Sequence, residues 1–137
     1  TYQYRILNTQ MPDPNRRRNT YFYRRKLDME AMRAAADCIV GTHDFACFMA
    51  AGSQVTDTVR TVYSLELVKI DDVITMTIQG NGFLYNMVRI IAGTLIQVGS
   101  GQLEPEQVAD IIKEGERKNA GPTAPAKGLT LKVIEYE

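Results

Sequence analysis

The feature that most constrains the fold is an apolar stretch with one arginine near its centre. It reads GNGFLYNMVRIIAGTLIQVGSG and spans residues 80–101. Projected onto a helix, residues 83–98 place most of their side chains on one broad apolar face, made of Leu84, Met87, Val88, Ile91, Leu95 and Val98. The remaining polar residues form a single line with helical spacing, made of Asn86, Arg89, Gly93 and Gln97. The pattern predicts a largely buried helix whose Arg89 points away from the domain's own core, toward a second body.

Two interpretations of Arg89 are open at this level. The arginine could extend to water or pair with a structural carboxylate, as long cationic side chains commonly do. It could instead pair with an acid in a functional cleft, where a buried charge needs a partner. Gly93 lies beside it on the polar line and would let another segment approach the helix backbone closely.

The rest of the chain predicts an α+β domain. Residues 1–8 alternate in polarity like a strand, and Asp28 can cap a helix that ends at Gly41. A hairpin is expected over residues 58–80 with its turn at Asp71–Asp72, followed by the arginine-bearing helix, a short helix from Pro105 and a closing strand from residue 129. The order is β-α-β-β-α-β. We expect 1–137 to be a single domain with a ferredoxin-like antiparallel sheet, helices on one face, and the other face open to single-stranded RNA or a partner sheet.

A basic and aromatic segment interrupts this pattern after the first strand. Residues 8–26 are expected to form a long arm or irregular hairpin, and 42–57 a packed loop. The arm interleaves aromatic residues with cations, which are Arg16, Arg17, Arg18, Arg24, Arg25 and Lys26. Such a segment could contact RNA phosphates and stack on bases, although a solvated loop is the more common explanation of such a run.

Composition narrows the classes of function. The chain has 16 lysines and arginines and 16 aspartates and glutamates, so it has no net charge that would attract a polyanion. Any site for a polyanion must therefore be a local cluster of basic residues. With two cysteines and one histidine, a zinc site built by this chain is not expected, and both thiols are predicted to be reduced, as in a cytosolic protein. The sequence suggests neither a signal peptide nor a membrane span, and its opening on a strand pattern without methionine suggests a segment of a longer protein.

Several other residues have both a structural and a functional interpretation. Tyr2 and Tyr4 share a strand face, which more often means core than site. His43 and Asp44 could form an acid/base pair but fit a turn after the helix better, and Cys47 is expected to be buried sulfur. The loop AGPTAPAKGL, residues 120–129, is either a rigid connector or a wall against a ligand.

Five segments carry a resemblance to a known family. YQYRI, LDMEAMRAAADCIVGTHDFACF, TVRTV, GNGFLYNMVRIIAGTLIQVGSG and AGPTAPAKGLTL occur in this order and resemble the C-terminal half of the bacterial tRNA pseudouridine synthase A family. The resemblance implies an enzyme that isomerises uridine to pseudouridine in the tRNA anticodon stem-loop (family positions 38, 39 and 40) without a cofactor or metal. It also implies a cytoplasmic homodimer in which two similar halves join sheet to sheet around the RNA-binding cleft.

The resemblance assigns roles to three residues. Tyr2 corresponds to the family's active-site tyrosine, which contacts the target uracil, and Leu129 is a candidate for packing against the base. Arg89 corresponds to the arginine that pairs with the catalytic aspartate. That aspartate belongs to an R-T-D-A-G motif of the N-terminal half, which this chain does not contain, and Asp57 does not correspond to it. The chain alone is therefore expected to be inactive and to need the N-terminal half as its partner.

Two other classes of protein share the predicted topology. A non-catalytic RNA-binding module would bind RNA in a salt-dependent way and would tolerate loss of Arg89. A regulatory domain that dimerises through its sheet would have a small-molecule pocket away from Arg89 and would ignore tRNA. The segment NGFLYNMVRIIAGTL favours the enzyme over both.

Overall fold

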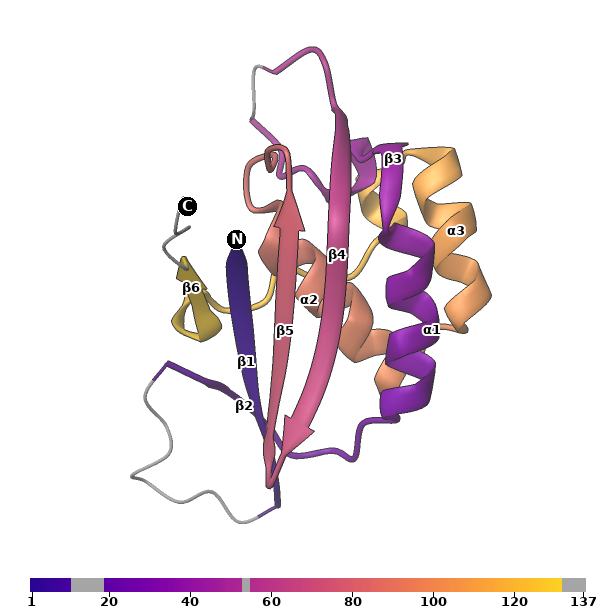
Figure 1. Ribbon diagram of the computed structural model, residues 1–137. Coiled ribbons are helices and arrows are strands. Elements are labelled where there is room, and N and C mark those ends of the chain that lie inside the picture. The colour runs from indigo at the N-terminus through magenta and orange to yellow at the C-terminus, as the bar shows by residue number, and fades with distance from the viewer. Residues whose placement is uncertain (11–18, 53–54, 132–137) are drawn as a thin grey trace.

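The computed structural model describes residues 1–10, 19–52 and 55–131, which form a sheet with helices packed against one face (Figure 1). The strands are β1 (Tyr2–Asn8), β2 (Tyr21–Tyr23), β3 (Gly41–Asp44), β4 (Val59–Ile70), β5 (Val73–Gly80) and β6 (Leu129–Leu131). The helices are α1 (Met29–Ile39), α2 (Met87–Gly99) and α3 (Pro105–Glu114). Short 3-10 turns occur at Ala46–Phe48, Arg117–Asn119 and Ala126–Gly128.

The strand order confirms the predicted ferredoxin-like fold. β6, β1, β5 and β4 lie side by side, and each neighbouring pair is antiparallel. Two short strands extend this sheet. β2 and β6 share the same edge of β1: β6 pairs with its N-terminal part, and β2 runs parallel to its C-terminal part. β3 pairs with the start of β4. The N-terminal and C-terminal strands are therefore neighbours, which places Tyr2 opposite Leu131 and Tyr4 opposite Leu129.

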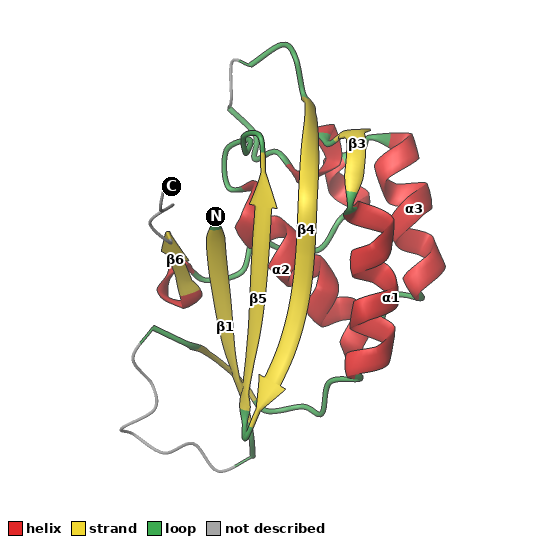
Figure 2. Cartoon of the chain, viewed as in Figure 1, coloured by secondary structure: helices red, strands yellow, loops and turns green. Residues whose placement is uncertain are grey.

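The β4–β5 hairpin divides the sheet into a buried face and an outer face. Ile74, Met76 and Ile78 of β5 are fully buried, whereas the intervening threonines are partly exposed. This alternation is that of a sheet covered on one side only. Figure 2 shows all of the labelled helices on the covered side. The predicted turn is present, with Asp71 in a left-handed conformation at a φ of 53°.

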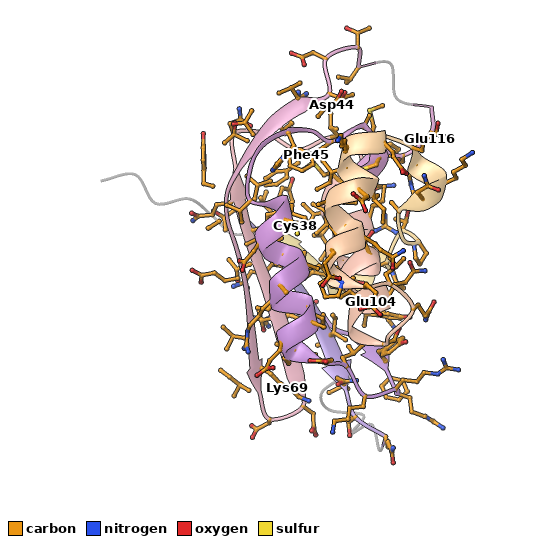
Figure 3. All side chains as sticks on the ribbon, turned by 90° about the vertical axis from the view of Figure 1, so that its right-hand side faces the viewer. Cys38, Asp44, Phe45, Lys69, Glu104 and Glu116 are labelled. Atoms are coloured by element: carbon orange, nitrogen blue, oxygen red, sulfur yellow. The ribbon has the colours of Figure 1, made fainter. Side chains whose placement is uncertain are left out.

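The helices form the second layer. The side chain of Asp28 caps α1 by accepting a hydrogen bond from the amide of Ala31 at 3.2 Å, as its position predicts. Figure 3 shows α1 and α3 side by side, with Cys38 on α1 and Glu104 at the start of α3. α2 packs closely on α1, because a Cβ added to Gly99 would lie 2.7 Å from the sulfur of Met32.

Three boundaries differ from the prediction. The expectation of a packed loop over 42–57 was wrong for its first residues, because β3 pairs with β4 and a 3-10 turn follows it. Long-range pairing of this kind leaves no local periodicity. The arm of residues 8–26 contains β2, again through pairing with a distant strand. The helix begins at Met87 and not at Phe83, because Asn86 adopts a left-handed conformation that the helix cannot include.

Candidate active site

α2 is buried along almost its whole circumference, as the apolar pattern predicts. Its partly exposed residues are Arg89 and Gln97, which lie on the predicted polar line, while Gly93 on the same line is buried. The helix is covered by the sheet and α1 on one side and by a segment of residues 120–125 on the other. We call this segment the 120–125 loop.

The 120–125 loop crosses α2 in direct backbone contact. A Cβ added to Gly93 would lie 1.8 Å from the carbonyl oxygen of Pro122, so only glycine fits at this crossing. The amide of Gly121 donates to the hydroxyl of the buried Thr94 at 2.9 Å. Arg117 supports the loop from outside by donating to the carbonyl of Gly121 at 2.8 Å and to the hydroxyl of Thr123 at 3.2 Å. The close approach predicted at Gly93 is thus made by the chain's own loop, which is a rigid connector at this point.

Two acceptors of this chain hold the guanidinium of Arg89. Its Nε donates to the carbonyl oxygen of Ala124 at 2.7 Å, and its Nη1 donates to Oδ1 of Asn86 at 3.3 Å. The amide of Ala124 in turn donates to the carbonyl of Arg89 at 3.0 Å. Within the described ranges, no carboxylate forms an ion pair with Arg89. The arginine therefore keeps N–H donors that neither acceptor uses, and its charge has no acidic partner among the described residues.

Arg89, Tyr2 and Leu129 line one pocket of about 280 Å³, although they come from α2, β1 and β6. Its remaining lining residues precede or begin α2 and are Phe83, Leu84, Tyr85, Asn86, Met87 and Val88. We call it the Arg89 pocket. The pairing of β1 with β6 brings Tyr2 and Leu129 to the same edge of the sheet, and the 120–125 loop sets the position of Arg89 beside them.

Aromatic rings form one wall of the Arg89 pocket. The ring of Tyr2 packs edge to face against Phe83, with 5.3 Å between the centroids and an interplanar angle of 88°. Tyr85 lies at the rim with 62 % of its surface exposed. The pocket combines a cation with aromatic surface, an arrangement that suits a planar base next to an anionic group.

Tyr4 is a structural neighbour of the pocket. It is fully buried, and its hydroxyl donates to the carbonyl of Pro125 at 2.6 Å. Burial raises the pKa of Tyr4 well above its ordinary value, the nearby Tyr21 acts in the same direction, and Arg89 acts against them. Tyr4 therefore stays neutral and attaches the end of the 120–125 loop to β1. The aromatic pair of the first strand thus divides into a core residue, Tyr4, and a pocket residue, Tyr2.

His43, Asp44 and Asp57 have structural partners. Nε2 of His43 lies 3.1 Å from the carbonyl oxygen of Val40, and its ring packs edge to face against Phe45. Oδ1 of Asp44 accepts from the amide of Ala46 at 3.1 Å and from the hydroxyl of Thr58. Oδ1 of Asp57 accepts from the amide of Val59 at 3.1 Å, at the start of β4. These residues do not line the Arg89 pocket.

The described basic residues of the arm do not line the Arg89 pocket. Arg24, Arg25 and Lys26 are exposed, and the guanidinium carbon of Arg24 lies 5.8 Å from the centre of the Phe22 ring. The predicted contacts of Arg16, Arg17 and Arg18 fall outside the described residues. The buried Asn8 fixes the described end of the arm by donating from Nδ2 to the carbonyls of Tyr23 and Arg25 at 2.9 and 2.6 Å.

Sequence reasoning missed two groups that hold the arginine. In the sequence pattern Asn86 is only one member of the polar line. The contact of Ala124 is made by its backbone carbonyl, which every residue has, so the sequence gives no sign of it. Of the AGPTAPAKGL segment, the described pocket lining includes only Leu129. Proline and glycine spacing showed that the segment is constrained but not which element constrains it.

Within residues 1–10, 19–52 and 55–131, no cluster of three or more histidine, cysteine, aspartate or glutamate side chains could hold a metal ion. None of the helices described is both long and apolar enough to cross a bilayer. The cysteines described, Cys38 and Cys47, are free thiols.

Comparison with known proteins supplies the family. The model of the tRNA pseudouridine synthase family matches residues 35–137. Over 135 residues the chain is 45 % identical to tRNA pseudouridine synthase A of Acetivibrio thermocellus, 48 % to that of Brevibacillus brevis and 47 % to that of a Thermoanaerobacter species. Each alignment covers 98 % of this chain and 55 % of the relative, so the chain spans about half the length of these relatives. The chain belongs to the tRNA pseudouridine synthase family.

Proposed function

We propose that this chain forms one wall of the active site of an enzyme that isomerises uridine to pseudouridine in the tRNA anticodon stem-loop. The observation that carries this proposal is the convergence of Arg89, Tyr2 and Leu129 on one pocket, with the cation lacking an acidic partner among the described residues. The opposite wall, with the catalytic carboxylate, comes from an N-terminal half of the same enzyme.

Arg89 pairs with that carboxylate. A guanidinium favours the ionised form of an acid within about 4–6 Å and lowers its pKa, and this effect grows as water is excluded. The two acceptors from this chain leave Nη donors free for the acid. The carboxylate thus stays charged and available as a nucleophile at neutral pH.

The reaction needs no external reagent. The target uridine leaves its stack and enters the cleft, the carboxylate attacks, and the bond between ribose C1′ and uracil N1 breaks. The detached uracil rotates, a bond forms from C5 to C1′ and the bond made by the carboxylate breaks, which releases the free carboxylate. C5 loses a proton and N1 gains one, so the product is an isomer. Tyr2 orients the ring and assists removal of the C5 proton, and Leu129 packs against the base.

The surrounding surface serves the RNA. Arg24, Arg25 and Lys26 are exposed and contact phosphates of the stem-loop, with Arg16, Arg17 and Arg18 continuing the same arm. The full-length enzyme acts as a cytoplasmic homodimer.

The direct test combines this chain with the N-terminal half of a pseudouridine synthase A relative and measures tritium release from C5-labelled tRNA. Release is expected from the mixture and not from either half alone. If both halves are folded and associated and no tritium is released, the proposal fails. A salt-sensitive RNA affinity without turnover would then favour the non-catalytic binding module.

A further inference from the structure

The residue before α2 is held in an unusual way. Asn86 has a φ of 59° and a ψ of 14°, a left-handed conformation that most residues avoid. An asparagine at a helix N-cap normally has an extended backbone, and its side chain accepts a hydrogen bond from one of the first amides of the helix. Asn86 makes no such cap. Its Oδ1 instead accepts from Nη1 of Arg89 at 3.3 Å, one turn further on.

This contact limits how Arg89 can present its charge. A guanidinium has five N–H donors, one on Nε and two on each of the terminal nitrogens Nη1 and Nη2. The Nε–H is already engaged by the carbonyl of Ala124 at 2.7 Å, so the edge that combines Nε with one terminal nitrogen is not free for an anion. Because Oδ1 of Asn86 takes one hydrogen of Nη1, an anion is left with Nη2 and the second hydrogen of Nη1.

We propose that Asn86 is a positioning residue for Arg89. Together with the carbonyl of Ala124 it fixes the plane of the guanidinium, so that the Nη2 end faces the partner carboxylate before the substrate arrives. This inference rests on the proposed pairing of Arg89 with a catalytic carboxylate. A planar cation that is already oriented loses less conformational freedom when the acid and substrate assemble around it.

A purely conformational role for Asn86 makes a different prediction. Asparagine tolerates a left-handed backbone better than most residues, and that tolerance alone could explain its place before α2. Glycine adopts the same backbone without a steric penalty and has no side-chain acceptor. Asn86→Gly therefore removes the contact with Arg89 and keeps the chain's path.

The test compares Asn86→Gly with a matched variant in the full-length enzyme that carries this chain. Asp71 also has a left-handed backbone, with a φ of 53°, and is exposed in the β4–β5 turn outside the lining of the Arg89 pocket, so Asp71→Gly controls for the backbone effect of glycine. We expect Asn86→Gly to lower kcat by about tenfold or more with less than about a threefold change in KM, and Asp71→Gly to change neither. An Asn86→Gly kcat within about twofold of wild type would overturn the proposal.

A spectroscopic measurement separates positioning from stability. If both ends of the guanidinium are held, rotation about its Nε–Cζ bond is slow and the two Nη nitrogens of Arg89 give separate nitrogen-15 resonances. These should remain separate in Asp71→Gly and in Asn86→Asp, which keeps an acceptor oxygen at the same place, and should merge in Asn86→Gly. Separate resonances in Asn86→Gly would contradict the proposal even if the variant were less stable.

The failure of this inference can be distinguished from failure of the proposed function. If Arg89→Lys keeps full activity, the proposed pairing with a carboxylate is wrong and the role of Asn86 falls with it. If Arg89→Lys is inactive while Asn86→Gly is fully active, the pairing stands and only the positioning role is lost.

Discussion

Arg89 and Ala124 are joined twice, since the arginine Nε donates to the Ala124 carbonyl at 2.7 Å and the Ala124 amide donates to the Arg89 carbonyl at 3.0 Å. One bond fixes the side chain and the other fixes the helix backbone against the 120–125 loop. Because both bonds involve the same pair of residues, a change in the loop or in α2 should alter the Arg89 pocket.

Replacing Arg89 by lysine tests the need for a guanidinium. Lysine keeps the charge, but its single ammonium cannot reproduce the planar arrangement that contacts Ala124, Asn86 and an anion together. We expect tritium release by the full-length enzyme to fall by about 100-fold or more, with tRNA affinity changed less than about threefold. Arg33→Lys is the control, because Arg33 donates to the carbonyl of Leu67 outside the pocket. Equal activity of both variants would exclude a specific role for Arg89.

Tyr2→Phe removes one hydroxyl from the Arg89 pocket and keeps the ring. The edge-to-face contact with Phe83 should persist, so the midpoint of thermal unfolding should stay within about 2 °C of wild type. Turnover should fall by about 10²-fold or more if the hydroxyl assists removal of the C5 proton. Tyr63→Phe, at an exposed position on β4, should leave turnover unchanged. A fully active Tyr2→Phe enzyme would restrict Tyr2 to packing against the base.

Gly93→Ala tests the crossing of α2 and the 120–125 loop. The added Cβ would lie 1.8 Å from the Pro122 carbonyl oxygen, which forces the loop away from the helix. We expect a loss of about 2–3 kcal/mol in the free energy of unfolding, measured with urea. In Gly82→Ala the new Cβ would have its nearest contact at 3.5 Å, with the Arg60 side chain, and the cost should be small. Similar urea midpoints for the two variants would show that the loop is free to move.

Cys47 should be unreactive in the folded chain. Its side chain is fully buried, and burial raises its pKa from 9.0 to about 12. At pH 8 the native thiolate fraction is then about a thousandfold lower than that of an ordinary cysteine, so alkylation by iodoacetamide should require unfolding. Mass spectrometry before and after addition of denaturant provides the measurement. Rapid native labelling of Cys47 would show that its environment opens.

The same raised pKa predicts a pH effect on stability. The unfolded chain loses the Cys47 proton above about pH 9, while the folded chain retains it up to about pH 12. The stabilisation is therefore fully present below pH 9 and is lost as the pH rises toward 12. Urea midpoints measured across this range should decline, and Cys47→Ala should make the decline shallower.

The orientation of Arg89 could be predicted because it follows from helical spacing alone. Arg89, Gly93 and Gln97 lie on one line of α2, and a line of polar residues on an otherwise apolar helix is expected to face away from the core. The hairpin turn at Asp71–Asp72 and the cap at Asp28 were likewise local features with a direct chemical cause. These elements gave the ferredoxin-like order correctly.

The features that could not be predicted depend on distant partners. Nothing within residues 41–44 indicates that β4 will pair with them, and nothing within 21–23 indicates a parallel neighbour in β1. The hydrogen bond between Asn86 and Arg89 could not be predicted either. Helical projection assumes a helical backbone, and Asn86 does not have one. The carbonyl of Ala124 that holds Arg89 belongs to a backbone path that only the packed structure defines.

The backbone contact between Gly93 and Pro122 also bears on how the cleft can close on RNA. Gly93 and Pro122 lie outside the lining of the Arg89 pocket, but their main chains are in contact behind Arg89, so this part of the molecule has no free space through which α2 and the 120–125 loop could move closer together. If the proposed enzyme encloses a uridine, we therefore expect the movement to come from the proposed N-terminal half or from rim side chains such as Tyr85.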